Sequence, residues 1–472
     1  MQPWLAHALC AFRVGPTHTG QAAVVSIGND AGDLDSLCSS MALAVWRPIG
    51  EDDGIEPLWV PVAPFDRCDF KLRQDACLLF GHVNLPFDDD GAPAELLHLD
   101  DLDCELTAQW QGAGGLGVAL VDHNACGAGV GKVLGERVVA IVDHHSDEKR
   151  HLVPSSSDAA VEAAGDDALA ALVTAAPPLR VVDPAVGSTC SLLAELMDAP
   201  GGALASYPTI LVPMLSAIAV DTRGFSPPLL NEKFVALDVR AAQHILLALG
   251  ATVPRILPPT GRPGSEGFEL VLESILALRQ VELPPSAQVG NAKTLPELSD
   301  ALLAARYDVA ALTTVELMRW DYKEVVRAGG LTLGVAAICE VVDDLFKRSG
   351  GPAELQADMI EASERRGAGG LGLLVGLTKE DAAAGGLKGL VALLPPADDA
   401  RAPPAAALLE AIDGIPTLPP ALASNALFRA QSIEDEGFGI SWQPVEGAPR
   451  LRISTLREQA TRKTLMPALL RL

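Results

Sequence analysis

The stretch Ala23–Asp35, AVVSIGNDAGDLD, decides the fold of this chain. Its first five residues, Ala23–Ile27, form a β-prone run without polar alternation, which is typical of a central strand covered on both faces. Amide and acidic side chains follow at once, and Ser36–Trp46 then has the composition of a helix. A strand, a polar loop and a helix in this order predict an α/β fold with a parallel sheet and a ligand site beyond the strand's carboxyl end.

Three later segments repeat this arrangement of an apolar run that closes on an acidic residue. Two of the runs, Gly117–Val121 and Val138–Val142, have the length and composition of buried strands and close on Asp122 and Asp143. The third, Leu211–Asp221, reads as an apolar helix. Because the carboxyl ends of parallel strands meet at one edge of a sheet, we expect their acidic residues to gather there.

Composition limits the classes of protein to which the chain can belong. Its 61 acidic and 35 basic residues give a net charge of -26, which argues against nucleic-acid partners. Hydrophobic residues make up 49% of the 472 residues, as in a globular protein. We expect no signal peptide, no membrane span and no membrane partner, and the eight cysteines lack Cys-x-x-Cys spacing. These features predict a cytoplasmic protein with reduced thiols, whose oligomeric state the sequence leaves open.

A stretch rich in proline and glycine divides the chain. Residues 251–266 have the composition of a linker, so we expect one domain at 1–250 and a smaller α/β domain at 267–472. Within the second domain, Val309–Leu312 and Leu331–Ile338 are predicted strands.

Two further segments resemble insertions. Residues 154–178 are rich in Ala, Ser and Asp, and residues 394–407 are rich in Pro and Ala. Both are predicted to be surface loops, and their role is left open.

The polar residues at the strand ends form a set of metal-ligand types. Asp33 and Asp35 are one residue apart in a tight loop, and the segment Asp143-His144-His145 adds imidazoles to the acids at positions 122 and 221. Carboxylates and imidazole suit Mn²⁺, Co²⁺ or Mg²⁺. Two such ions about 3.5–4 Å apart could activate water and clamp a phosphoryl group. An isolated Asp-x-Asp is more often a helix cap, so this interpretation depends on the whole set.

The order of these motifs resembles the DHH phosphoesterase superfamily, and within it the branch that holds family II inorganic pyrophosphatases, cytosolic exopolyphosphatases and prune proteins. The matching elements in the first domain are Asn29-x3-Asp33-x-Asp35-Ser36, Asp122-His123-Asn124, Asp143-His144-His145, Gly187-Ser188 and Asp221. Asp321-Tyr322-Lys323-Glu324 and Thr461-Arg462-Lys463 resemble elements of the DHHA2 domain in that branch. The resemblance implies a DHH domain and a DHHA2 domain with the active site in the cleft between them.

The resemblance also implies roles for individual residues. One divalent cation would be held by Asn29, Asp33 and Asp122. A second would be held by Asp35, Asp122, His144 and Asp221, so that Asp122 bridges the two and is catalytic. His145 would contact phosphate and protonate the leaving group. Lys323, Arg462 and Lys463 would bind substrate phosphate oxygens.

Asn29 stands where pyrophosphatases have His, and an amide oxygen is the weaker ligand for Mn²⁺. Asn at this position resembles exopolyphosphatases and prune proteins, and His145 resembles the fungal-type exopolyphosphatases, since prune proteins have Arg there. The resemblance therefore favours removal of terminal phosphate from polyphosphate, with release of orthophosphate.

Several alternatives stay open at the level of sequence. They are a manganese-dependent pyrophosphatase, a prune-like phosphodiesterase of cyclic nucleotides, a non-catalytic scaffold and a single-strand nuclease. The negative charge of the chain repels long polyphosphate, although the tail Arg450–Leu472 carries six basic residues against Glu458. Chain-length preference and the physiological metal are left open.

Overall fold

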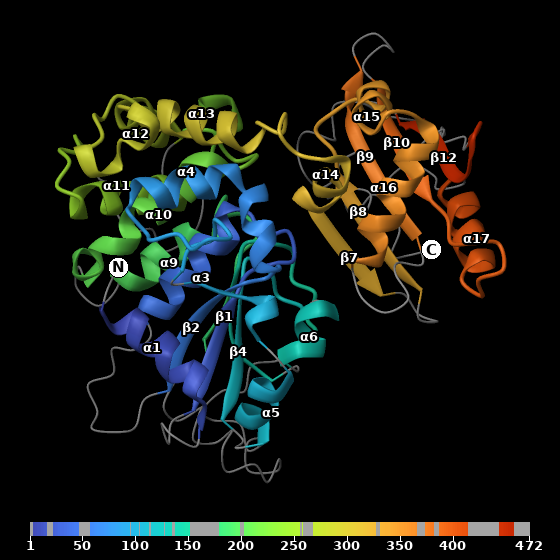
Figure 1. Ribbon diagram of the computed structural model, residues 1–472. Helices are drawn as coiled ribbons and strands as arrows, with labels where there is room; N and C mark the ends of the chain where they lie inside the picture. Colours follow the sequence, from blue (N-terminus) through green and yellow to red (C-terminus); the bar gives the residue numbers. More distant parts are fainter. Residues whose placement is uncertain are drawn as a thin grey trace. The chain divides into compact units, whose positions relative to one another are not determined.

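The computed structural model shows two compact units, Met1–Arg306 and Tyr307–Leu472, which are described separately (Figure 1). The structure describes residues 3–16, 22–46, 57–94, 96–102, 104–112, 115–126, 128–134, 137–151, 179–198, 203–254, 257, 268–326, 331–365, 373–381, 387–413 and 443–456.

The first unit is built on a parallel sheet of six strands in the order β3-β2-β1-β4-β5-β6. Its strands are β1 (Ala23–Ile27), β2 (Leu58–Ala63), β3 (Leu97–His98), β4 (Leu116–Val121), β5 (Val138–Asp143) and β6 (Leu179–Val182). The predicted strands that end at residues 27, 121 and 142 are therefore confirmed, the last with one further residue. The strand order reverses between β1 and β4, and parallel sheets bind ligands at such a point.

Helices cover both faces of this sheet (Figure 1). One face carries α3 (Leu34–Trp46), α9 (Thr189–Asp198), α10 (Pro208–Asp221), α11 (Ala236–Ala248), α12 (Phe268–Leu278) and α13 (Leu295–Arg306), together with α4 (Gln74–His82). The other face carries α1 (Pro3–Val14), α5 (Cys104–Gly112) and α6 (Ala128–Leu134). Short 3-10 turns are η1 (Arg67–Leu72), η2 (Leu99–Asp101), η3 (Ala203–Ser206), η4 (Pro227–Leu229), η5 (Pro285–Ala287) and η6 (Val289–Asn291).

Strand β1 shows why its sequence does not alternate. Val24 packs into the core beneath α3, whereas Val25 and Ile27 pack into the core beneath α1 and α5. Successive strand residues point to opposite faces, so a strand covered on both sides buries every side chain, and in β1 only Ser26 is polar. Burial on both faces fixes the position at which the strand ends in the sheet. It therefore also fixes where the polar loop begins.

Along the chain, the boundary between the two compact units falls between residues 306 and 307, whereas the sequence analysis placed a linker at 251–266. The reason is that α12 and α13 bury apolar side chains, such as Ile275 and Leu302, in the core of the first unit. The proline-rich stretch thus precedes two helices of the first unit.

The second unit is also α/β, with a mixed six-stranded sheet in the order β11-β12-β10-β9-β8-β7. Its strands are β7 (Tyr322–Val326), β8 (Thr332–Ala337), β9 (Leu373–Asp381), β10 (Leu387–Leu393), β11 (Gln443–Val445) and β12 (Ala448–Leu456). Its helices are α14 (Thr314–Trp320), α15 (Val342–Ser349), α16 (Pro352–Glu364) and α17 (Ala402–Asp413). Only β8 and β9 pair in parallel; the other neighbours are antiparallel.

Two predictions for the second unit need correction. Val309–Leu312 is a turn closed by a 3.1 Å hydrogen bond from Leu312 N to Val309 O, because Thr313 already caps α14. The predicted loop 394–407 contains the start of α17 at Ala402. Prolines there lie in the first turn, where their missing N–H groups cost no helical bond. The predicted strand 331–338 is confirmed as β8, and residues 154–178 lie outside the described residues.

None of the helices in the described part of the chain is long and apolar enough to cross a membrane. The cysteines at positions 10, 38, 68, 77, 126, 190 and 339 are free thiols.

The loop after β1 depends on a close approach at Gly28. A Cβ atom at this position would lie 2.5 Å from Ser36 Cβ and 2.9 Å from Ser36 O. We predict that Gly28→Ala lowers the free energy of unfolding by about 1–3 kcal/mol through overpacking. Gly81→Ala is the matched control, because a Cβ at this exposed position in α4 meets nothing within 4 Å. It should raise stability by up to about 1 kcal/mol. Urea unfolding monitored by circular dichroism measures both, and equal effects would contradict the close-approach account.

Candidate metal centre

The candidate site is built at the point where the strand order reverses. The loops that follow β1, β4 and β5 carry Asn29, Asp122 and His144 respectively. Neighbouring parallel strands place these three loops side by side, and α3, α9 and α10 add residues from the covering layer. Segments more than 180 positions apart in the chain are thereby brought together, since Asp35 and Asp221 also interact electrostatically.

Asp122 is the centre of this arrangement. Its backbone adopts a left-handed conformation with φ of 60°, held by a 3.0 Å hydrogen bond from Asp122 N to Val142 O. Its Oδ2 accepts hydrogen bonds from Asn29 Nδ2 and from Ser36 Oγ, both at 2.6 Å. Its buried Oδ1 accepts no well-aligned hydrogen bond from the described residues and lies 3.2 Å from His144 Nε2. One carboxylate oxygen is therefore fixed and the other faces the site.

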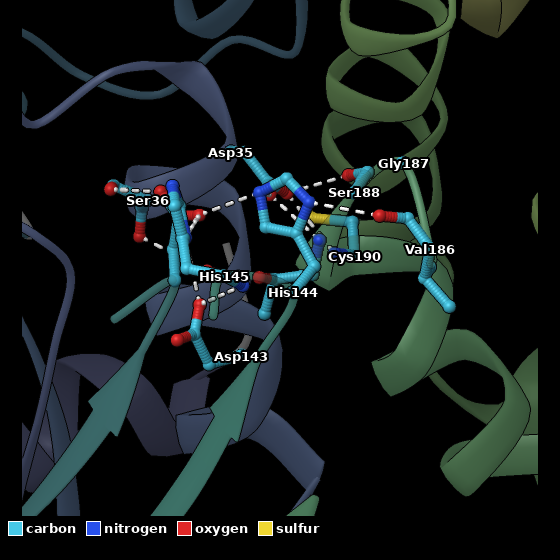
Figure 2. Close-up of polar contacts among 12 residues, drawn as sticks. Asp35, Ser36, Asp143, His144, His145, Val186, Gly187, Ser188 and Cys190 are labelled. Carbon is cyan, nitrogen blue, oxygen red and sulfur yellow. Dashed lines mark hydrogen bonds and ion pairs between the residues drawn. The ribbon is translucent and has the colours of Figure 1, made fainter. Parts of the chain in front are cut away.

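His144 presents one ring nitrogen to the carboxylates because its other nitrogen is engaged. Nδ1 lies 3.1 Å from Val186 O and donates to it (Figure 2). This leaves Nε2 facing Asp122 Oδ1 and, at 3.9 Å, Asp35 Oδ2. A hydrogen bond of this kind orients the metal-binding histidines of proteins. Burial opposes the charged ring, but the hydrogen bond and charge of Asp122 and the charge of Asp35 raise the pKa of His144 to about 10.

Asp35 lies in the first turn of α3, and its carboxylate contacts the N-terminus of α9. Its Oδ1 accepts from Ser188 Oγ at 2.7 Å and Cys190 N at 3.0 Å, and its Oδ2 accepts from Thr189 N at 2.7 Å (Figure 2). The backbone N–H groups at a helix start stabilise an anion in this position. Burial, followed by the negative charge of Asp122, nevertheless raises the pKa of Asp35 to about 6.

Asp221 completes the group of carboxylates from the end of α10. Its Oδ2 is buried without a hydrogen-bond partner among the described residues. Burial and the nearby charges of Asp35 and Asp33 raise its pKa well above the usual range. An unpartnered buried carboxylate beside two others is unfavourable unless a positive charge compensates it.

The residues present fit a divalent cation. Asp122, His144 and His145 offer ligand atoms that all lie within 4.8 Å of one another. Among the described residues, two buried oxygens, Asp122 Oδ1 and Asp221 Oδ2, have no hydrogen-bond partner, and the possible metal ligands here are oxygen and imidazole nitrogen atoms. This chemistry matches Mg²⁺, Mn²⁺ or Co²⁺.

His145 is oriented by a different carboxylate. Asp143 Oδ1 accepts from His145 N at 3.0 Å and from His145 Nδ1 at 2.9 Å, so Nε2 is the ring atom that remains for a ligand (Figure 2). Asn124 Nδ2 donates to the other oxygen, Asp143 Oδ2. Although burial opposes ionisation, the hydrogen bond and charge of His145 lower the pKa of Asp143. The first Asp of the Asp-His-His motif thus supports a histidine.

The structure gives two predicted ligands additional roles. Asn29 turns its amide nitrogen toward Asp122, while its Oδ1 accepts from Ala31 N at 2.9 Å. Asp33 Oδ1 accepts from Ser36 N at 3.1 Å, as an N-cap of α3 does. Whether Asn29 and Asp33 also bind a metal stays a prediction.

Sequence reasoning missed a cation beside these groups. Arg306, the last residue of α13, places its guanidinium 3.8 Å from Asp33 Oδ2 and 4.0 Å from Asp75 Oδ2. Asp75 is buried in α4, and burial raises its pKa. No motif links positions 33, 75 and 306, so only the packing of α13 against α4 reveals the cluster.

The predicted substrate-binding cations belong to the second unit. Lys323 lies on β7 opposite Val335 of β8 and is partly exposed. Arg462 and Lys463 lie outside the described residues. Their roles stay predictions.

An Asp-His-His segment stands at a parallel strand end, with acids from three other segments around it. This arrangement agrees with the motif order that resembles the DHH phosphoesterase superfamily. Among curated proteins the chain is similar to exopolyphosphatase PRUNE1 of Bos taurus, with 25% identity over 333 residues, and to that of Homo sapiens, with 26% identity over the same length. Each match covers 71% of this chain but 56% of the relative, so it spans little more than half of the relatives' length.

The other comparisons add little. No family model matches the chain. Among solved structures, a Methanococcus jannaschii protein assigned to the family II inorganic pyrophosphatases matches with 16% identity and a TM-score of 0.46, covering 95% of this chain and 98% of that one. No conclusion about this chain rests on a match at that level.

The raised pKa values predict that metal binding releases protons. At neutral pH the metal-free site holds a proton on His144, whose pKa is raised to about 10, and a cation must displace it to reach Nε2. Apparent Mn²⁺ affinity should therefore increase as pH rises from about 6 to about 9, by up to about tenfold per pH unit for each proton released. Calorimetry in buffers of different ionisation enthalpy measures this.

The control for that experiment is His244→Gln. His244 pairs with Asp198 at 2.9 Å, on α11 and α9, and is not among the grouped ligand atoms. This variant should keep the pH dependence, whereas His144→Gln should flatten it. Affinity independent of pH in the unsubstituted protein would contradict the assignment of His144 as a ligand.

Proposed function

We propose that the chain is an exopolyphosphatase, which hydrolyses the terminal phosphoanhydride bond of inorganic polyphosphate and releases orthophosphate. The observation that carries the proposal is the convergence of Asp35, Asp122, His144 and Asp221 around carboxylate oxygens that lack partners. The names of the PRUNE1 relatives support the same phosphoanhydride chemistry.

In this proposal Asp35, Asp122, His144 and Asp221 hold a divalent cation. When bound, the cation would act as a Lewis acid, activate water and neutralise charge on the transferring phosphoryl group. The resemblance implies a second cation at Asn29, Asp33 and Asp122.

His145 is proposed to serve the leaving group. Asp143 accepts the hydrogen on Nδ1 and holds the ring, so Nε2 is the atom that can contact a phosphate oxygen and deliver a proton to it. A carboxylate in this position favours a single ring orientation and tautomer. Asn124 donates a hydrogen bond to Asp143 and so helps to hold the pair of Asp143 and His145 in place.

Substrate phosphates are proposed to bind cations of the second unit. Lys323, Arg462 and Lys463 would contact phosphate oxygens, and the fork of Arg462 can engage two oxygens at once.

A second candidate substrate is pyrophosphate. The net charge of -26 disfavours a long polyanion at a distance and favours a short one that a cation can bind directly. A short phosphoanhydride needs no extended basic surface.

A panel of substrates separates these proposals. Phosphate release would be measured from long polyphosphate, tripolyphosphate, pyrophosphate and cyclic AMP, each with Mg²⁺, Mn²⁺ or Co²⁺. We expect the fastest release from polyphosphate. Faster release from pyrophosphate would replace the first proposal by the second, and inactivity with every pair would favour a non-catalytic scaffold.

Substitution of the central carboxylate tests the site itself. We predict that Asp122→Asn lowers kcat/KM by at least about 100-fold with the fold retained, because an amide provides no anionic ligand. Asp183→Asn is the matched control: Asp183 also follows a strand, β6, but its Oδ1 accepts from Ala185 N at 3.0 Å, in its own loop. Equal losses in the two variants would contradict the proposed role of Asp122.

A further inference from the structure

One oxygen of Asp122 is already saturated by protein donors. Ser36 Oγ accepts from Asn29 N at 3.2 Å, which directs the hydroxyl hydrogen toward Asp122 Oδ2 at 2.6 Å. Asn29 Nδ2 reaches the same oxygen, also at 2.6 Å. A carboxylate oxygen offers about two lone-pair sites, and these two donors fill both.

The orientation of the Asn29 amide is fixed from its other side. Asn29 Oδ1 accepts from Ala31 N at 2.9 Å, within the same loop. Turning the amide over would set its NH₂ group against the Ala31 N–H and its oxygen against the Asp122 carboxylate. Both contacts would be repulsive, and with Asn29 only 6% exposed no bulk water could replace them.

The remaining ligand for a cation at this position is also engaged. Asp33 uses Oδ1 to cap α3 through Ser36 N, and Arg306 approaches Asp33 Oδ2 at 3.8 Å. A cation beside Asp33 would thus share Asp122 Oδ1 with the first cation and meet a positive guanidinium nearby. By contrast, Asp221 Oδ2 has no hydrogen-bond partner among the described residues, and His144 directs Nε2 at Asp122 Oδ1, 3.2 Å away.

We propose that Asn29 and Ser36 are positioning residues that reserve Asp122 Oδ1 for one tightly bound divalent cation, and that the site beside Asp33 binds a second cation only weakly. This inference rests on the proposed function for the identity of the ligand. It differs from the paired cations that the resemblance implies, because a donor amide stands where a metal ligand was predicted.

The test counts bound Mn²⁺ per chain by equilibrium dialysis, with free Mn²⁺ measured by electron paramagnetic resonance. We expect one tight ion in the unsubstituted protein and a second with affinity about 10- to 100-fold lower. Asn29→Asp keeps the shape of the side chain but replaces the donor with an anionic acceptor. This variant should bind two ions with similar affinity, and Ser36→Ala should raise the second affinity by a smaller factor.

Asn124→Asp is the matched control. Asn124 is also buried and also donates its amide to an aspartate, but that partner is Asp143, which holds His145. This control should still bind one tight ion. Circular dichroism checks that each variant folds, and Ser36→Ala keeps the test decisive if Asn29→Asp does not fold.

Two results would overturn the proposal. They are two ions of similar affinity in the unsubstituted protein, and a second affinity that neither Asn29→Asp nor Ser36→Ala changes. Because the readout is binding, it is independent of hydrolysis. One bound ion without phosphate release would contradict the proposed function and leave this inference standing, and two tight ions with phosphate release would do the reverse.

Discussion

Repulsion among buried carboxylates is the constraint on which the rest of the structure depends. Asp35 and Asp122 are buried and Asp221 is partly buried. Burial and the charges of neighbouring carboxylates raise the pKa values of Asp35 and Asp221. In a low-dielectric site such charges destabilise the fold unless hydrogen bonds, a proton or a cation offset them. Each surrounding feature can be understood as part of that compensation.

The protein supplies compensation in three ways. The start of α9 directs backbone N–H groups at Asp35, Asn29 and Ser36 donate to Asp122, and His144 places its proton between the carboxylates. A folded scaffold has to hold these donors in place, and the parallel sheet does so by burying its strands on both faces. These donors leave negative charge uncompensated on only a few carboxylate oxygens. A cation can bind at those oxygens.

Much of this arrangement was predictable from the sequence, because it lies in strand ends and motif spacing. Three strands were predicted from the apolar runs before Asn29, Asp122 and Asp143. Their carboxyl ends were expected at one edge of the sheet, together with the acidic residues that follow them. The resemblance implied a ligand role for Asn29, and neither it nor periodicity could show that the amide nitrogen of Asn29 faces Asp122. Nor could it show contacts between distant helices, such as that of Arg306 with Asp75, or the packing of α13 that extends the first unit past the predicted linker.

The most direct test of the central claim is a crystal structure of the protein soaked in Mn²⁺, with anomalous diffraction recorded at the manganese edge. The account predicts a strong peak within bonding distance of Asp122 Oδ1, His144 Nε2 and Asp221 Oδ2. A map with no peak among these atoms at a saturating Mn²⁺ concentration, or with peaks only elsewhere on the protein, would contradict it.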